Sequence, residues 1–279
     1  MKPKGAYSQS KEPMEWRYNN PAFEVDQVHP AIQESPWGGH RKFAYDLVTA
    51  IRPTSIVELG TFVGASLFAF AQGVKDAGLK TSLDAVDTWL GDEHAGYYGD
   101  GVYQFVHDVS TSLFAEQKIR LLRKTFLDAR QDLPDSSVTI LHIDGLHTYE
   151  AVKEDFETWL CKVAPHGIVL FHDVATERDY GSVTYWRELS TRYPSLTFHH
   201  SHGLGVLFPK GDRYLPLVMG AEWIARNMVY SLDFVAHANA LLVSKFNTKA
   251  HEQQEQIAHL EQLLLEKDAL LERLKRASA

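Results

Sequence analysis

The stretch Glu58-Leu59-Gly60-Thr61-Phe62-Val63-Gly64 decides the fold, because it follows the apolar residues 55–57 directly. This order predicts a buried strand that ends in an acidic, glycine-rich turn at the start of a helix. Gly60 permits the tight turn, and Gly64 allows the helix, whose first N–H groups face a ligand, to pack closely. Such a turn is typical of nucleoside cofactor sites, although it also occurs in α/β proteins without a cofactor.

Composition limits the class of protein. The chain has 279 residues, 44% of them hydrophobic, and a net charge of -8 at pH 7, which argues against nucleic acid as a partner. Its single cysteine, Cys161, cannot form an internal disulfide, and residues 1–5 lack the apolar core of a signal peptide. These two features predict a reducing, cytoplasmic setting. No apolar stretch reaches the length of a transmembrane segment, so we expect a soluble chain.

Strands and helices are predicted to alternate between residues 40 and 209. This alternation predicts an α/β fold, a Rossmann-like doubly wound sheet that is mostly parallel. A closing hairpin adds one antiparallel strand. The expected strands are residues 55–59, 82–86, 120–122, 138–143, 167–171, 196–200 and 205–208, and the expected helices are residues 43–51, 66–75 and 149–163.

Four segments follow from this pattern. Residues 1–39 are polar and rich in proline, so we expect a loop or lid with little core. Residues 40–212 form the main domain, and residues 213–249 form an amphipathic helix that packs on that domain or on a partner. Residues 250–279 carry apolar side chains at alternating spacings of three and four, which favours a coiled coil and an oligomer over a solvated single helix.

Polar residues follow three of the predicted strands, where ligands collect in such sheets. They are Asp87, Asp144 and the pair His172-Asp173. Each has an ordinary alternative as a helix cap, a turn former or a core histidine. Together they predict a divalent cation, because clustered carboxylates repel one another unless a cation or proton lies between them. Oxygen ligands favour Mg²⁺, and a histidine ligand leaves Mn²⁺ open.

Several ordered blocks lie between about residues 35 and 208. They are Ser35-Pro36-Trp37-Gly38-Gly39-His40, Ala85-Val86-Asp87-Thr88-Trp89, Gly91-Asp92-Glu93-His94-Ala95-Gly96-Tyr97-Tyr98, His142-Ile143-Asp144-Gly145-Leu146-His147-Thr148-Tyr149 and His200-Ser201-His202-Gly203-Leu204-Gly205-Val206. In these blocks the chain resembles class I S-adenosylmethionine (SAM) methyltransferases of the macrocin O-methyltransferase and cephalosporin-hydroxylase-like group. The turn resembles their E-x-G-x-x-x-G pattern and lacks the G-x-G-x-x-G of dinucleotide sites.

The resemblance implies a role for most of these residues. Asp144 and Asp173 would bind the cation, with His172 as a further ligand or a substrate contact. His147 would be the base, unless it merely caps the next helix. We expect a helix N-terminus to lower its pKa. The expected cofactor residues are Glu58, Gly60, Thr61, Gly64, Ser66, Asp87 and Trp89, with Thr61 and Ser66 offering hydroxyls to a carboxylate. Residues 89–105 are interpreted as a long loop inserted between a strand and a helix. The weaker substrate contacts, mostly in this insert, are His94, Tyr97, Tyr98 and His202.

These expectations describe a metal-assisted SAM O-methyltransferase that acts on a hydroxyl of a sugar, a glycan terminus or a small polyol. Two alternatives stay open. One is a Rossmann-like oxidoreductase, which the missing G-x-G-x-x-G disfavours. The other is a catalytically silent scaffold that recruits partners through its coiled coil.

Overall fold

The computed structural model describes residues 14–94 and 96–277. Residues 1–13 of the predicted N-terminal segment, Ala95 of the insert, and residues 278–279 of the predicted tail lie outside this range. Among the described residues, no helix is both long and apolar enough to cross a membrane.

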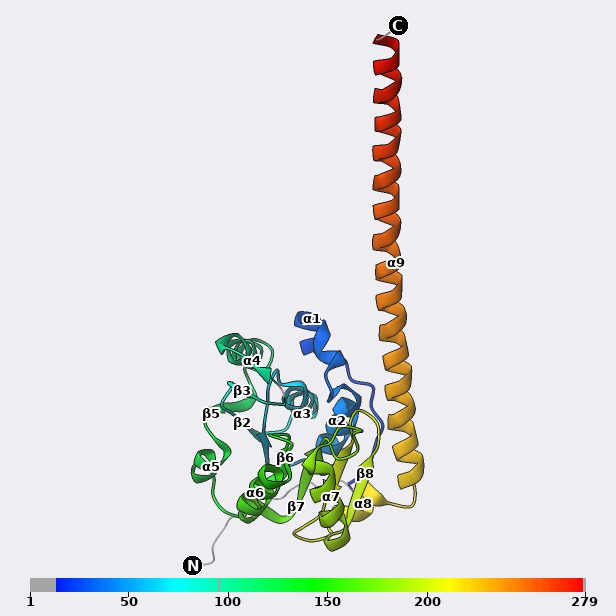
Figure 1. The fold of residues 1–279 in the computed structure, drawn as a ribbon. Coiled ribbons are helices and arrows are strands. Elements are labelled where there is room, and N and C mark those ends of the chain that lie inside the picture. Colours follow the sequence, from blue (N-terminus) through cyan, green and yellow to red (C-terminus); the bar gives the residue numbers. More distant parts are fainter. Residues whose placement is uncertain (1–13, 95, 278–279) are drawn as a thin grey trace, which may run out of the picture. The chain divides into compact units, whose positions relative to one another are not determined.

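Seven strands form one sheet in the order β5-β2-β1-β6-β7-β9-β8 (Figure 1). The first five of these are parallel, and β9 runs antiparallel to β7, so the predicted sheet with one antiparallel strand is confirmed. The strands are β1 Ser55–Leu59, β2 Ser82–Asp87, β5 Lys118–Arg123, β6 Val138–Ile143, β7 Val163–His172, β8 Ser195–Phe198 and β9 Leu204–Leu207. Two further strands, β3 Gly91–Asp92 and β4 Gly96–Tyr97, pair only with each other.

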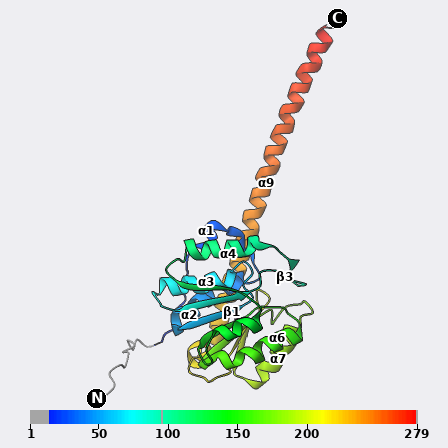
Figure 2. The same cartoon turned by 90° about the vertical axis from the view of Figure 1, so that its left-hand side faces the viewer.

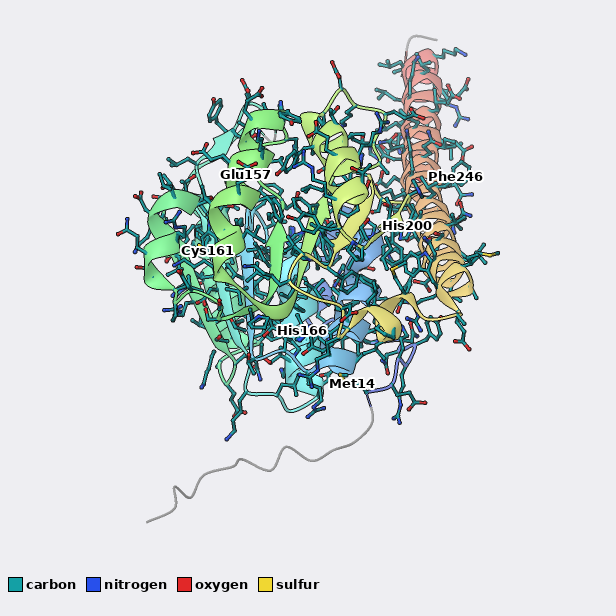
Figure 3. The ribbon with its side chains drawn as sticks, turned by 90° about the horizontal axis from the view of Figure 1, so that it is seen from below. Met14, Glu157, Cys161, His166, His200 and Phe246 are labelled. Atoms are coloured by element: carbon teal, nitrogen blue, oxygen red, sulfur yellow. The ribbon has the colours of Figure 1, made fainter. Side chains whose placement is uncertain are left out.

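Helices cover both faces of this sheet (Figure 2). The main helices on one face are α2 Arg41–Ile51, α3 Ala65–Asp76 and α4 Asp100–Ser112, and those on the other are α6 Tyr149–Trp159 and α7 Gly181–Arg192. Two hydrophobic cores result, and β1 contributes Ile56 to the first and Val57 to the second. The cause is geometric, because successive side chains of a strand point to opposite faces. Cys161 is exposed at the surface, just after α6 (Figure 3).

The N-terminal segment contributes to the core, so the expectation of little core there was wrong. It forms α1 Val25–Val28 and the short 3-10 helices η1 Pro30–Glu34 and η2 Gly38–His40. Val25, Ile32 and Trp37 are all buried within the first core. The prolines of this segment favour short helices, but they do not exclude the apolar side chains of these helices from the interior.

Two helices of the domain were not predicted. The insert 89–105 was interpreted as a long loop, but α4 begins inside it at Asp100. The helix α7 follows the loop after β7 and was missed entirely. The remaining short elements are α5 Phe126–Ala129, η3 Arg130–Asp132 and η4 Leu160–Lys162.

The C-terminal part consists of α8 Leu215–Met219 and the 55-residue α9 Trp223–Ala277. The chain divides into two compact units, one ending at Phe234 and one beginning at Val235. Within the first unit, α9 packs through Arg226 and Tyr230, whose side chains bond the Leu217 carbonyl and Asp46, respectively. Ile224 and Met228, two residues of the predicted apolar face, are 75% and 57% exposed and do not pack on the domain. For these two residues the alternative, packing on a partner, stays a prediction.

Asp155 in α6 gives the fold a pH dependence. Burial, and secondarily the neighbouring Glu154, raise its pKa to about 7. An acid whose pKa is raised by folding is destabilising once ionised, so its contribution to stability falls as pH rises from about 4 to 7. Asp155→Asn should therefore increase the free energy of unfolding at pH 8 by roughly 1–3 kcal/mol and leave it nearly unchanged at pH 4. Urea denaturation at both pH values measures this.

The exposed carboxylate Glu150 lies in the same helix and provides the control. Glu150→Gln should show no comparable gain at pH 8. An Asp155→Asn gain that is equal at both pH values would mean that the charge of Asp155 is not its cause.

Candidate cofactor and metal site

The turn after β1 touches the end of β6. Gly60 has φ +90°, and a Cβ atom there would lie 2.1 Å from the carbonyl oxygen of Asp144. Gly64, with φ +81°, precedes the first residue of α3. Both glycines therefore hold conformations that other residues rarely adopt, and the close approach at Gly60 brings the turn next to Asp144.

Asp87, at the end of β2, orders this turn. One carboxylate oxygen accepts the N–H groups of Thr61 and Phe62, each at 2.9 Å, and the other accepts that of Trp89 at 2.7 Å. A carboxylate has about four acceptor positions, so Asp87 keeps capacity for further donors. Its side chain also lines a cavity of about 490 Å³.

A second cavity, of about 260 Å³, adjoins the first. Both are lined by the same four residues, Gly60, Phe62, Asp144 and His147. The larger cavity is otherwise bounded by residues that include Asp87, Thr88, Tyr98 and Phe126. The smaller is otherwise bounded by residues that include Trp37, Ser66, His94, Arg178, Tyr180 and His202.

The predicted convergence of Asp144, His172 and Asp173 is confirmed, and His147 joins them. His147 Nε2 lies 3.0 Å from Asp173 Oδ2 and 3.6 Å from Asp144 Oδ1. Ligand atoms of Asp144, His147 and Asp173 all lie within 4.8 Å of one another. Two carboxylates and an imidazole at this spacing fit a divalent cation.

His172 faces the same two carboxylates from the interior. Its Nε2 is 3.1 Å from the Ser201 carbonyl oxygen, which can only accept, so this nitrogen carries a hydrogen. Its Nδ1 lies 3.0 Å from Asp173 and 3.3 Å from Asp144. Burial alone would lower the pKa of His172, but the charges of Asp144 and Asp173 outweigh it and raise the pKa to about 10. Nδ1 therefore meets the carboxylates as a protonated donor, or presents its lone pair to a cation held between them.

The environment of His147 differs from the one expected. Burial would lower its pKa, but Asp144 and Asp173 outweigh burial and raise it to about 9. Burial likewise opposes ionisation of Asp144, yet His172 and His147 hold its pKa well below the usual range. Thr148, not His147, caps α6, because its hydroxyl accepts the N–H of Ala151 at 3.2 Å. The alternative in which His147 is only a helix cap is therefore wrong.

Other predicted residues lie at different depths. Trp89 is fully buried and lines neither cavity, and its indole supports the turn by donating to the Phe62 carbonyl at 3.0 Å. Tyr97 is 81% exposed and also lines neither cavity. Tyr98 lines the larger cavity, and His94 and His202 line the smaller. Glu58 is buried and accepts the Ser66 hydroxyl.

Sequence reasoning missed several lining residues. Arg178 and Tyr180 lie in the loop after β7, and the same rule that selected Asp173 could have included them. Phe62 belongs to the quoted turn, but its contact with Tyr98, at 5.1 Å between ring centroids, depends on the insert. Trp37 was noted only as part of a block of the N-terminal segment, and no local pattern indicated that it reaches the sheet.

Comparison with known proteins agrees with this geometry. Residues 57–174 match a family model described as a methyltransferase domain. The uncharacterized protein y4gI of Sinorhizobium fredii (strain NBRC 101917 / NGR234) is 48% identical over 187 residues, which are 66% of this chain and 20% of that protein. The chain thus spans about one fifth of the length of this curated relative.

Solved structures share the fold. A candidate caffeoyl-CoA O-methyltransferase from Staphylococcus aureus has a TM-score of 0.53 and 16% identity, covering 69% of this chain and 93% of that one. A methyltransferase from Geobacter sulfurreducens has a TM-score of 0.52 and 13% identity, covering 69% and 92%. Residues 57–174 are therefore similar to a methyltransferase domain, and the chain shares the fold of these solved structures.

If the carboxylate cluster holds a cation, Asp144→Asn should weaken Mn²⁺ binding at least tenfold, because it removes a negative ligand and leaves the size of the side chain unchanged. Calorimetric titration with Mn²⁺ and then Mg²⁺ measures the affinity. Asp108→Asn, an exposed aspartate on α4, is the matched control. Equal affinity of the Asp144→Asn variant and the native protein would place any cation elsewhere.

Proposed function

We propose that this protein is a SAM-dependent O-methyltransferase that uses a divalent cation, Mg²⁺ in the first place, to methylate a hydroxyl of a sugar, a glycan terminus or a small polyol. The observation that carries the proposal is the wall shared by the two cavities, where Gly60 and Phe62 meet Asp144 and His147. A cofactor that spans both cavities would place its methyl group at this wall, beside an acceptor in the smaller cavity. We also propose membership of the macrocin O-methyltransferase and cephalosporin-hydroxylase-like group, on the sequence blocks quoted above.

The larger cavity suits the nucleoside of SAM. Asp87 lines it with a carboxylate that can accept ribose hydroxyls, and Tyr98 and Phe62 offer aromatic faces to the adenine. The glycine turn, with Thr61 and Ser66, lines the smaller cavity and would receive the amino-acid end of the cofactor. The cofactor would then extend along the turn, past the shared wall.

The remainder of the smaller cavity suits a hydroxylated ring. The rings of His94, His147 and Tyr180 are nearly parallel, with 5.6 Å between the centroids of His94 and His147 and 4.6 Å between those of His147 and Tyr180. Flat faces of this kind pack against the apolar face of a sugar, while Arg178 and His202 supply hydrogen-bond donors.

Asp144, Asp173 and one histidine nitrogen would hold the cation. When bound, the cation supplies positive charge that lowers the pKa of an acceptor hydroxyl. His147 is our proposed base, since its ring lies at the shared wall, its Nε2 faces Asp173 at 3.0 Å, and its Nδ1 makes no hydrogen bond within the described structure. It can accept a proton only when neutral, which requires the charges of Asp144 and Asp173 to be compensated. His172, which bonds the Ser201 carbonyl, would act as a ligand or hold the two carboxylates in place.

The proposal predicts the ligand and the effect of removing the base. The protein should bind SAM and S-adenosylhomocysteine in calorimetry and should not bind NADH. With Mg²⁺ and a panel of sugars and polyols, it should convert SAM to S-adenosylhomocysteine. His147→Ala should lower that rate about a hundredfold or more and leave S-adenosylhomocysteine affinity nearly unchanged, because a base acts on the reaction and not on the cofactor.

Each failure points to a different alternative. Absence of S-adenosylhomocysteine binding would reject the methyltransferase, and NADH binding would favour the oxidoreductase. Cofactor binding without turnover on any acceptor would favour the scaffold. Full activity after thorough chelation would remove the cation from the proposal.

We also propose that the tail makes the protein a homo-oligomer. Ile257, Leu260, Leu264, Leu271 and Leu274 repeat at spacings of three and four along α9, and each is at least 44% exposed. Lys267 interrupts this apolar stripe. An isolated helix with such a stripe is marginal in water, so a second helix would stabilise it by covering the leucines.

Truncation after Lys249 should therefore lower the molar mass in solution to that of a smaller assembly or a monomer. S-adenosylhomocysteine affinity should not change, because residues beyond 249 line neither cavity. Light scattering on the full chain and the truncated chain, with calorimetry on both, measures the two effects. A full-length monomer would exclude self-association, and an unchanged oligomer would place the interface before residue 250.

A further inference from the structure

We propose that Trp37 is a positioning residue for the amino-acid end of the cofactor. It acts through His142 and Glu58 on Ser66, so that the Ser66 hydroxyl accepts a hydrogen bond from the α-ammonium group of the cofactor. This inference rests on the proposed function, because it assumes that a SAM-like ligand occupies the smaller cavity.

Four side chains from different parts of the chain form one buried series of hydrogen bonds. The indole Nε1 of Trp37 donates to Nε2 of His142 at 3.0 Å. On the other side of the imidazole, Nδ1 lies 3.0 Å from Oε1 of Glu58. The same oxygen accepts the Ser66 hydroxyl. Trp37, His142 and Glu58 are at most 3% exposed, so water does not compete for these bonds.

The direction of each bond is fixed by chemistry. An indole N–H can donate but cannot accept, so His142 must present a lone pair at Nε2. A neutral imidazole with that lone pair carries its hydrogen on Nδ1 and donates it to Glu58. Glu58 receives two donors on one oxygen, as an ionised carboxylate does. Its other oxygen, Oε2, is buried and has no hydrogen-bond partner in the described structure.

This direction determines what Ser66 offers to a ligand. Ser66 and Trp37 both line the smaller cavity, whereas Glu58 is not among its lining residues. The single hydrogen of the Ser66 hydroxyl is used on Glu58, so only acceptor lone pairs remain for the cavity. A ligand atom beside Ser66 must therefore be a donor, and the α-ammonium of the cofactor is one. The expectation that Ser66 donates to a carboxylate of the ligand disagrees with this arrangement, because its hydrogen is already used on the carboxylate of Glu58.

Trp37 matters because its indole N–H is the hydrogen-bond partner of Nε2 of His142. Without this donor, the buried Nε2 would have no partner, which costs free energy unless the imidazole turns or shifts toward another donor. An imidazole that moves no longer donates to Oε1 of Glu58 in the same geometry, so Glu58 and the orientation of the Ser66 hydroxyl would change with it.

The test compares two ligands in calorimetry. S-adenosylhomocysteine keeps the α-ammonium group, whereas 5′-methylthioadenosine has the nucleoside and the sulfur but lacks the amino-acid end. Trp37→Phe removes the indole donor and keeps an apolar ring. It should weaken S-adenosylhomocysteine binding about tenfold and leave 5′-methylthioadenosine binding unchanged, since the nucleoside does not contact Ser66 in this proposal. Equal weakening of both ligands, or of neither, would overturn it.

A second variant tests the route through His142. An asparagine side chain places an amide N–H where His142 Nδ1 lies, and this donor does not depend on Trp37. In a His142→Asn background, Trp37→Phe should therefore cost no further S-adenosylhomocysteine affinity, whereas additive losses would refute the relay.

Ser66→Ala supplies an independent arm if Trp37→Phe does not fold. It should weaken S-adenosylhomocysteine selectively, and an equal loss for both ligands would contradict the assignment. Failure of the native protein to bind either ligand would instead reject the proposed function.

Discussion

The close approach of Gly60 to the Asp144 carbonyl is the contact on which the site depends. A Cβ atom at residue 60 would lie 2.1 Å from the carbonyl oxygen of Asp144. Only glycine therefore allows β1 and β6 to end side by side with this turn between them. Asp87 then fixes the turn by accepting the N–H groups of Thr61 and Phe62. The consequence is that the glycine turn and Asp144 with His147, which are distant in sequence, line one wall shared by the two cavities.

Asp144, in that wall, and Asp173 beside it form their ion pairs with histidines among the described residues. Asp144 and Asp173 are balanced by His147 and His172, whose pKa values are raised to about 9 and 10. A histidine held in this way is a reversible counter-charge, because a divalent cation can take its place between the carboxylates. The same residues therefore suit both a protonated resting arrangement and the proposed cation-bound one.

Sequence patterns predicted the strands and the residues that directly follow them, because both depend on local order. The strand Val138–Ile143 and the convergence of Asp144 with Asp173 came from hydrophobic runs and from the topology of parallel sheets. The buried position of Trp37 could not be predicted from local order. Its position depends on a bond to His142, 105 residues away, and proline-rich composition indicated only a loop. The helix α4 was missed for a related reason, since glycine and polar residues around Asp100 resemble a loop until Val106 and Val109 are buried against the first core.

His142 differs from His147 and His172 in the groups that surround it. At His142, an indole donor fixes the neutral form and transmits direction to Glu58 through hydrogen bonds. At His147 and His172, carboxylates favour the charged form instead. The proposed reaction requires both states. The ammonium group of the cofactor needs a hydrogen-bond acceptor that does not change its protonation, whereas the substrate hydroxyl needs a nitrogen that can gain and lose a proton. His142 lies in β6 and His147 in the loop after it, two residues before and three residues after Asp144, so this one strand and its loop would position both halves of the chemistry.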